Sequence, residues 1–247
     1  MESKFSLPTE TVDLPSKGLL YPEDSPLSSG KVEMKYMTAK EEDILTNQNY
    51  IKNGTVIDKL LQSLIVSKDI KVNDLLIGDK NAIMIAARIL SYGKDYTVKF
   101  AGEDVVIDLS LLENKEIDEE LLNDKKNEFT FQLPNTDNIL SFRLLTHLDE
   151  KNIEREIEGK KKINRDSSTQ VTTRLAYVVT SVNGLSEKKD VREFVNNYLL
   201  AKDARALREY YNEVSPDINI QHTYTDEAGR EEVFDIPIGI DFFWPDI

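Results

Sequence analysis

KVEMKYMTAKEEDIL, residues 31–45, contains the first change from strand to helix that this sequence predicts. Polar and apolar side chains alternate through residues 31–36, which predicts a strand with one buried face. Thr38 and Glu41 have the spacing of a capping box, in which the threonine side chain bonds the third helical amide and the glutamate reaches back. We therefore expect a helix that begins after Thr38 and continues through Leu45.

A similar stretch, ILSFRLLTHLDEKNI, occupies residues 139–153 and leads from a strand through Thr146 into another helix. The helical sequence of residues 77–90 also faintly resembles that of residues 200–214. This internal similarity is explained either by two related modules or by chance resemblance between amphipathic elements, and both interpretations stay open. The expected fold class is α+β, with two related modules of helices packed on short antiparallel β-hairpins.

Periodicity and turn residues predict the other elements. We expect Asp79 to cap a helix that ends near Gly93, residues 158–168 to form a polar, basic loop, and one long helix to run from Val171 to Val182. Hairpins are expected over residues 96–109, 128–145 and 218–237, and further helices around residues 56–65, 194–199 and 207–214.

The predicted organisation has four parts. Residues 1–30 form an N-terminal arm, and residues 31–112 form the first α+β module. Residues 113–127 are strongly acidic, with Ile117, Leu121 and Leu122 on one side, and form a surface helix or a linker. Residues 128–247 form the second module, which ends in an aromatic segment.

Composition limits the classes of function. The 247 residues are 40% hydrophobic and 31% charged, which is typical of a globular chain that buries a core. A formal net charge of −14 repels phosphate backbones and argues against a nucleic-acid partner. The absence of cysteine excludes disulfides, thiol catalysis and cysteine-ligated zinc. No signal-peptide core and no apolar run of transmembrane length is present, so we expect folding in the cytosol and no membrane partner.

Catalytic and metal-binding signatures are not found in the sequence. Its two histidines, His147 and His222, have no nucleophile motif beside them and are expected to be surface or edge residues. The carboxylates near Glu41 are explained by their favourable place at a helix start. The basic run GKKKINR, residues 159–165, is explained by a solvated loop, with an acidic partner or nucleic acid as alternatives. We therefore expect no catalytic residue, no cofactor and no metal.

The two ends of the chain are more informative. LPSKGLLYP, residues 14–22, cannot form a helix around its prolines, yet its leucines and tyrosine require burial against this chain or another one. FFWP, residues 242–245, places aromatic side chains near the C-terminus, where they either close the core or anchor a partner. The candidate partner-binding residues are Leu14, Pro15, Lys17, Leu19, Leu20, Tyr21, Phe242, Phe243 and Trp244.

These two ends, together with the sequence between them, resemble the baseplate proteins of T-even-like contractile-tailed phages, a family that includes a central hub component and a hub-assembly protein. The resemblance covers the chain from about residue 12 to its end. It is carried by LPSKGLLYP, KVEMKYMTAKEEDIL, TTRLAYVVTSVNG (172–184), VREFVNNYLLAKDARALREYY (191–211) and IPIGIDFFWPDI (236–247). These motifs are packing and turn signatures, not catalytic ones.

The sequence departs from that family in one place. Relatives often carry a paired-cysteine knuckle between the last helix and the terminal strand, where this chain has HTYTDEAGREE, residues 222–232. In this chain a hairpin turn at Ala228 and Gly229 is expected to replace that knuckle. No metal site of the relatives is therefore transferred to this chain.

The resemblance implies a non-enzymatic tail protein that forms part of, or builds, the central hub of the baseplate by binding other baseplate or hub proteins, with homo-oligomers also possible. The alternative is a hub-assembly chaperone absent from the mature virion. The expected location is the host cytoplasm during assembly and the tail baseplate if the protein is retained. A tail hydrolase would need paired catalytic carboxylates in a cleft, and no strong pair is found.

Overall fold

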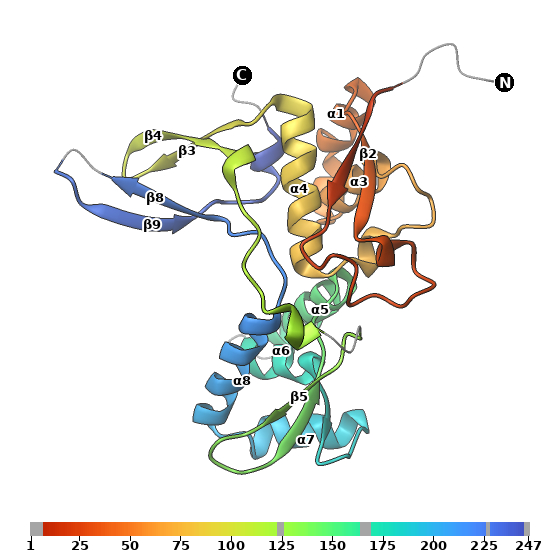
Figure 1. The fold of residues 1–247 in the computed structure, drawn as a ribbon, viewed down its shortest axis with the longest axis vertical. Helices are drawn as coiled ribbons and strands as arrows, with labels where there is room; N and C mark the ends of the chain where they lie inside the picture. Colours follow the sequence, from red (N-terminus) through yellow and green to blue (C-terminus); the bar gives the residue numbers. More distant parts are fainter. Residues whose placement is uncertain (1–6, 123–125, 164–168, 226–227, 245–247) are drawn as a thin grey trace.

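The computed structural model describes residues 7–122, 126–163, 169–225 and 228–244. Helices pack on small antiparallel sheets throughout, which confirms the predicted α+β class. The described elements form two lobes, one above the other, and a pair of hairpins extends to one side of the upper lobe (Figure 1).

The upper lobe contains the first predicted module. β1 (Thr9–Asp13) pairs antiparallel with β2 (Lys31–Lys35), with Thr9 opposite Lys35 and Asp13 opposite Lys31. Four helices pack beside this hairpin, and short 3₁₀ turns interrupt the connections. The helices are α1 (Ala39–Leu45), α2 (Gln48–Lys52), α3 (Val56–Leu64) and α4 (Ile77–Tyr92), and the turns are η1 (Pro26–Ser29) and η2 (Val72–Asp74).

The lower lobe is built on a three-stranded antiparallel sheet with the order β5-β6-β7. Helices lie around and above this sheet (Figure 1). The strands are β5 (Phe129–Gln132), β6 (Ile139–Phe142) and β7 (Val179–Val182), and the helices are α5 (His147–Ile163), α6 (Gln170–Val178), α7 (Lys188–Asn197) and α8 (Ala201–Val214).

Two further hairpins, one from each half of the sequence, lie side by side (Figure 1). Aromatic side chains join them: Phe100 stacks on Phe234 with ring centroids 4.2 Å apart, and Tyr224 meets Phe100 edge-on at 5.5 Å. The strands are β3 (Asp95–Phe100), β4 (Glu103–Asp108), β8 (Gln221–Thr225) and β9 (Glu231–Asp235). The hairpin predictions for this part of the chain are thereby confirmed.

The chain crosses between the lobes twice, and the two crossings pair with each other. After η3 (Leu109–Leu111), Lys115 donates its amide to the carbonyl of Asp217 at 2.8 Å, and Asn219 donates to the carbonyl of Glu113 at 2.9 Å. The acidic stretch then forms one 3₁₀ turn, η4 (Glu119–Leu122). Residues 123–125 of that predicted linker lie outside the described residues.

The C-terminal segment returns to the upper lobe. It forms the 3₁₀ turn η5 (Asp241–Phe243), and the Phe242 ring meets Tyr96 of β3 with centroids 4.8 Å apart. Residues 221–244 therefore lie beside the first module, although the sequence assigned them to the second. The division of the chain into folding units stays a prediction.

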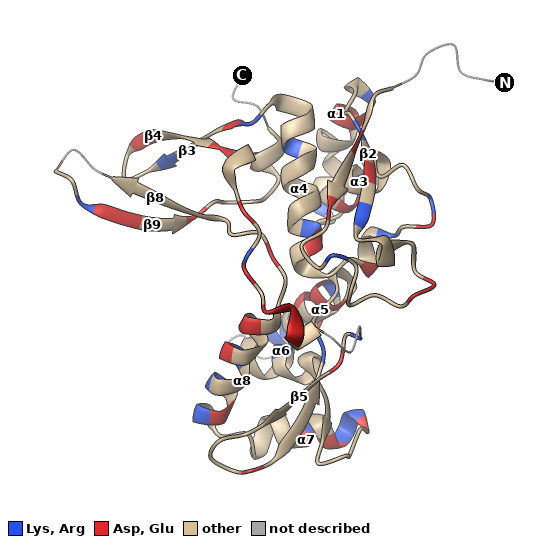
Figure 2. Cartoon of the chain, in the orientation of Figure 1, with Lys and Arg blue, Asp and Glu red and all other residues tan. Residues whose placement is uncertain are grey.

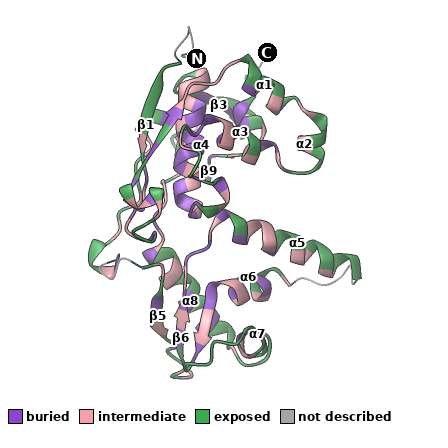
Figure 3. Cartoon of the chain, turned by 90° about the vertical axis from the view of Figure 1, so that its right-hand side faces the viewer, coloured by how far each residue is buried: buried purple, intermediate pink, exposed green. Residues whose placement is uncertain are grey.

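The predicted capping box at Thr38 is confirmed, and a second one, which was not predicted, forms at Thr146. Glu41 accepts the amide of Thr38 at 3.0 Å, and Lys35 bonds the same carboxylate at 2.8 Å. In the lower lobe the carboxylate of Asp149 accepts the amide of Thr146 at 2.9 Å. Buried residues run through both lobes (Figure 3). The two capping side chains, Glu41 and Asp149, are themselves buried.

The predicted long helix from Val171 to Val182 is wrong. α6 ends at Val178, and the next four residues form β7, which pairs with β6. Three of those four residues, Val179, Thr180 and Val182, are β-branched and suit a strand, and the open edge of β6 gives them a partner. Helical spacing of valines could not separate the two outcomes.

Three local predictions also need correction. The residue before α4 is Leu76, and Asp79 is the third residue of that helix with its side chain fully buried. Residues 158–163 continue α5 and are not a loop, while residues 164–168 lie outside the described residues. His147 is buried, and its Nε2 lies 2.5 Å from Oδ1 of Asp58, so it is not a surface residue.

Candidate functional site

The candidate partner-binding residues of the LPSKGLLYP segment are divided between core and surface. Leu14, Leu20 and Tyr21 are 2%, 3% and 7% exposed and pack against this chain. Pro15 and Leu19 are half-buried, and Lys17 is exposed. Only the last three leave part of their side chains exposed, so the segment is a loop of the β1–β2 hairpin with one outward face.

A buried carboxylate holds this loop. Asp79 accepts the amide of Ser16 at 2.9 Å, the hydroxyl of Ser16 at 2.7 Å and the hydroxyl of Tyr21 at 2.6 Å. The same Tyr21 oxygen accepts the amide of Leu76 at 2.8 Å, at the start of α4. Burial raises the pKa of Asp79, and it also raises the pKa of the Tyr21 phenol.

Glycine is required where the loop closes on itself. Gly18 and Gly30 both have positive φ, 78° and 69°. A Cβ on Gly18 would lie 2.4 Å from the carbonyl oxygen of Ser28, and one on Gly30 would lie 2.5 Å from that of Lys17. The two ends of the loop therefore touch, and Lys17, itself at φ 51°, is held at its outer surface.

A groove of about 480 Å³ runs between this outer surface and the crossing connection. Its apolar walls come from Pro15 and Leu19 on one side and from Ile117 and Leu122 on the other. Lys17 and Glu119 form an ion pair across it, with both side chains more than half exposed. Since both are solvated, this pair contributes little to stability and can be exchanged for a partner's charge.

The three C-terminal candidates are likewise divided. Phe242 and Phe243 are fully buried, whereas Trp244 is 43% exposed. Trp244 lies at a wide hollow that Arg88 and Tyr92 of α4 also line. The tryptophan is therefore the one aromatic side chain of the terminal segment available to another molecule.

Sequence reasoning did not identify two parts of this arrangement. The sequence predicts Asp79 as a helix cap, and it places Ile117 and Leu122, the second wall of the groove, on the apolar side of a surface helix or a linker. The apolar pair was a usable signal, but its partner across the groove is about 100 residues away in the sequence. Nothing in the sequence indicates that contact.

Two kinds of site, a metal centre and a membrane-spanning helix, are absent from the described residues. No group of three or more His, Asp or Glu side chains in that part of the chain could hold a metal ion. None of its helices is long and apolar enough to cross a membrane. His147 and Lys151 both contact the carboxylate of Asp58. Burial raises the pKa of Asp58, but the hydrogen bonds from these two residues outweigh burial and lower the pKa to about 2. This cluster joins α3 to α5 and has a structural role.

The fold and the groove define an α+β protein with fixed surface loops and recessed sites suited to protein contacts. A family model described as T4 bacteriophage base plate protein matches residues 9–244, nearly the whole chain. The chain belongs to this family of phage baseplate proteins. No curated protein and no solved structure matches it.

Proposed function

We propose that this protein forms part of, or builds, the central hub of a contractile-tail baseplate, and that it acts by binding other baseplate proteins without catalysis. Membership of the baseplate family over residues 9–244 carries this proposal. The groove beside Lys17 and Leu19 supports it, because a rigid recess with apolar walls and a charged rim is typical of protein-binding surfaces.

Two roles fit these observations, a retained hub subunit and an assembly chaperone that leaves before the particle is complete. Quantitative mass spectrometry of purified mature particles separates them. A fixed, small copy number per tail is expected for a hub subunit. Abundance in infected cells with absence from particles would assign the chaperone role, and absence from both particles and assembly intermediates would contradict the proposal.

The groove itself is tested with Leu19→Asp, which places a charge on its apolar wall. We expect this variant to fold and to lose co-sedimentation with baseplate intermediates. Leu111→Asp is the matched control, since Leu111 is 75% exposed and does not line the groove. Equal co-sedimentation of both variants would exclude the groove as the binding surface.

A further inference from the structure

A different cavity, of about 400 Å³, lies in the lower lobe where α5, α6, β7 and the start of α7 meet. Three cationic residues line it, Arg143, Lys188 and Arg192, against one carboxylate, Asp149. The lining itself therefore has more cationic than anionic side chains, in a chain with a formal net charge of −14. Cationic groups that line a recess attract an incoming anion.

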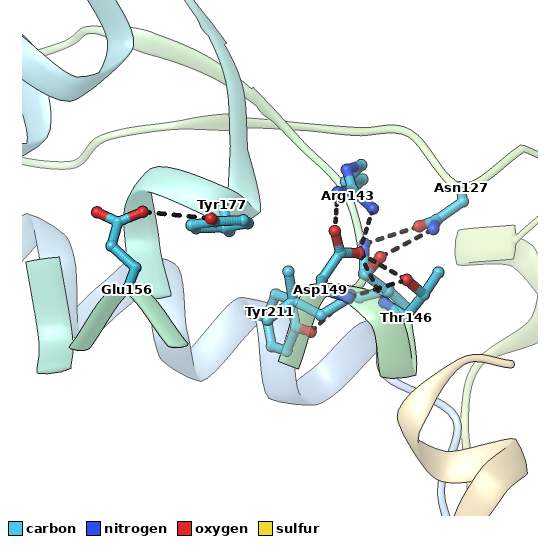
Figure 4. Close-up of polar contacts among 9 residues, drawn as sticks. Asn127, Arg143, Thr146, Asp149, Glu156, Tyr177 and Tyr211 are labelled. Atoms are coloured by element: carbon cyan, nitrogen blue, oxygen red, sulfur yellow. Dashed lines mark hydrogen bonds and ion pairs between the residues drawn. The ribbon is translucent and has the colours of Figure 1, made fainter. Parts of the chain in front are cut away.

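The single carboxylate of the cavity is already engaged. The carboxylate of Asp149 accepts hydrogen bonds from both terminal nitrogens of Arg143 at 2.7 Å. It also accepts hydrogen bonds from the amide and the hydroxyl of Thr146 at 2.9 and 2.8 Å. Figure 4 shows Arg143 and Thr146 converging on this carboxylate from either side. Asp149 therefore fixes the plane of the guanidinium group and has little capacity left to bind a second cation.

Arg192 is fixed in the same way by a residue outside the cavity lining. Its terminal nitrogens donate to the two oxygens of Glu156 at 2.7 and 2.8 Å, and its guanidinium lies 5.7 Å from the Tyr177 ring centroid. Tyr177 also donates its hydroxyl to Glu156 at 3.2 Å (Figure 4). The bond from Arg192 is the main reason that the pKa of Glu156 falls to about 2.

Lys188 completes the charged lining. It is the first residue of α7, its side chain is exposed, and no ion pair is described for it among the residues that the structure covers. Basic residues gather at this end of α7 (Figure 2). Glu187 and Asp190 belong to the same turn but do not line the cavity.

We propose that this cavity binds an acidic side chain of a partner polypeptide. The proposal rests on the protein-binding function proposed above. Each arginine uses two of its five N–H groups internally and keeps others for a ligand. Because both guanidinium groups are already immobilised, a carboxylate binds without a further loss of their side-chain entropy. The volume suits one or two side chains, and the net charge repels a nucleic acid.

The test uses the full chain and a fluorescent tetraglutamate peptide with blocked ends, measured by anisotropy at low salt. We expect Lys188→Gln and Arg192→Gln each to weaken binding by about fivefold or more, which is the loss of one charged contact. Arg205→Gln is the matched control, because Arg205 pairs with Glu209 at 2.8 Å on the exposed face of α8 and does not line the cavity. It should bind as the wild type does.

Three results would overturn the proposal. The first is wild-type affinity in both cavity variants, and the second is an equal loss in Arg205→Gln, which would indicate attraction to any surface cation. The third is binding of inorganic phosphate, with the same dependence on Lys188, by a chain that does not bind the peptide. Since the Lys188 side chain is exposed, its substitution is not expected to unfold the protein, and thermal melts check this.

Co-sedimentation with baseplate intermediates separates this proposal from the one on which it rests. Association of the wild type but not of Lys188→Gln supports both. Association of both chains overturns the cavity proposal and leaves the proposed function intact. If neither chain associates while peptide binding still depends on Lys188, the proposed function fails and the cavity proposal stands.

Discussion

The start of α4 and the start of α8 are built alike, yet they treat their buried carboxylates differently. Asp79 and Asp203 are each the third residue of their helix, both are fully buried, and each helix follows a leucine at its N-cap. Each carboxylate accepts bonds from the loop of the preceding hairpin: Asp79 from Ser16 and Tyr21, and Asp203 from Asn135 and Thr136.

The pKa values of the two groups move in opposite directions. Burial raises the pKa of Asp79 despite its three hydrogen bonds. Burial also opposes ionisation of Asp203, but the bonds from Asn135 and Thr136 outweigh it and lower the pKa. The surroundings of the two groups differ. The carboxylate of Asp217 raises the pKa of Asp79 further, and the Ser16 donor is fully buried, whereas Asn135 is exposed and brings solvent close to Asp203.

The largest expected effect comes from removing the carboxylates. Asp79→Ala leaves the Ser16 and Tyr21 donors buried without an acceptor and should lower the free energy of unfolding by about 3 kcal/mol. Asp203→Ala should cost about 1–2 kcal/mol, because water can reach its exposed partner Asn135. Urea denaturation measures both, and equal losses would contradict the difference drawn between the two helix starts.

The neighbouring position should show the next largest effect. A Cβ on Gly78 would lie 1.9 Å from the carbonyl oxygen of Pro216, where α4 meets the crossing connection. Gly78→Ala should therefore destabilise the protein by about 2 kcal/mol through overpacking. The equivalent residue of α8 is the exposed Lys202, and Lys202→Ala should change stability by less than about 0.5 kcal/mol. An unchanged melting temperature in Gly78→Ala would show that the contact is loose.

The phenol of Tyr21 distinguishes the upper site. Tyr21→Phe removes one donor to Asp79 and the acceptor for the Leu76 amide, so it should cost about 1–2 kcal/mol. Because the tyrosine bond lowers the pKa of Asp79, its loss should raise that pKa further. NMR titration of the Asp79 carboxyl carbon checks the second effect, and a fall in that pKa would refute the assignment of the bond.

The smallest expected effect is a difference in how the stability of the two sites depends on pH. The Asp203 contribution to stability is present above the ordinary aspartate pKa of 3.8 and is lost as the pH falls through its lowered folded value. The Asp79 contribution is present below 3.8 and is lost as the pH rises through its raised folded value. As the pH rises, the difference in free energy of unfolding between wild type and Asp203→Asn should therefore grow. The difference between wild type and Asp79→Asn should shrink. Parallel slopes would contradict this.

Local devices were predictable because their residues are close together in the sequence. The capping box at Thr38, the helix that follows Thr146 and the hairpins follow from local sequence patterns. β7 was not predictable, since Val179 and Val182 fit a helix until β6 offers an open edge. For Leu14 and Phe242 the sequence predicts burial either in this chain or against a partner. Their burial in this chain depends on contacts near them with Asp79 and Tyr96, which lie 65 and 146 residues away. The cavity at Arg192 depends on four separate elements and had no sequence signal.

The return of residues 241–244 to the upper lobe has a consequence for the protein as it is synthesised. Tyr96 emerges from the ribosome long before Phe242, the residue that covers its ring. The upper lobe therefore remains incomplete until Phe242 has been translated, and contacts of such long sequence separation form slowly. A complete upper lobe thus requires that translation has passed residues 241–244, and a chain terminated before them would expose an apolar patch to cellular proteases.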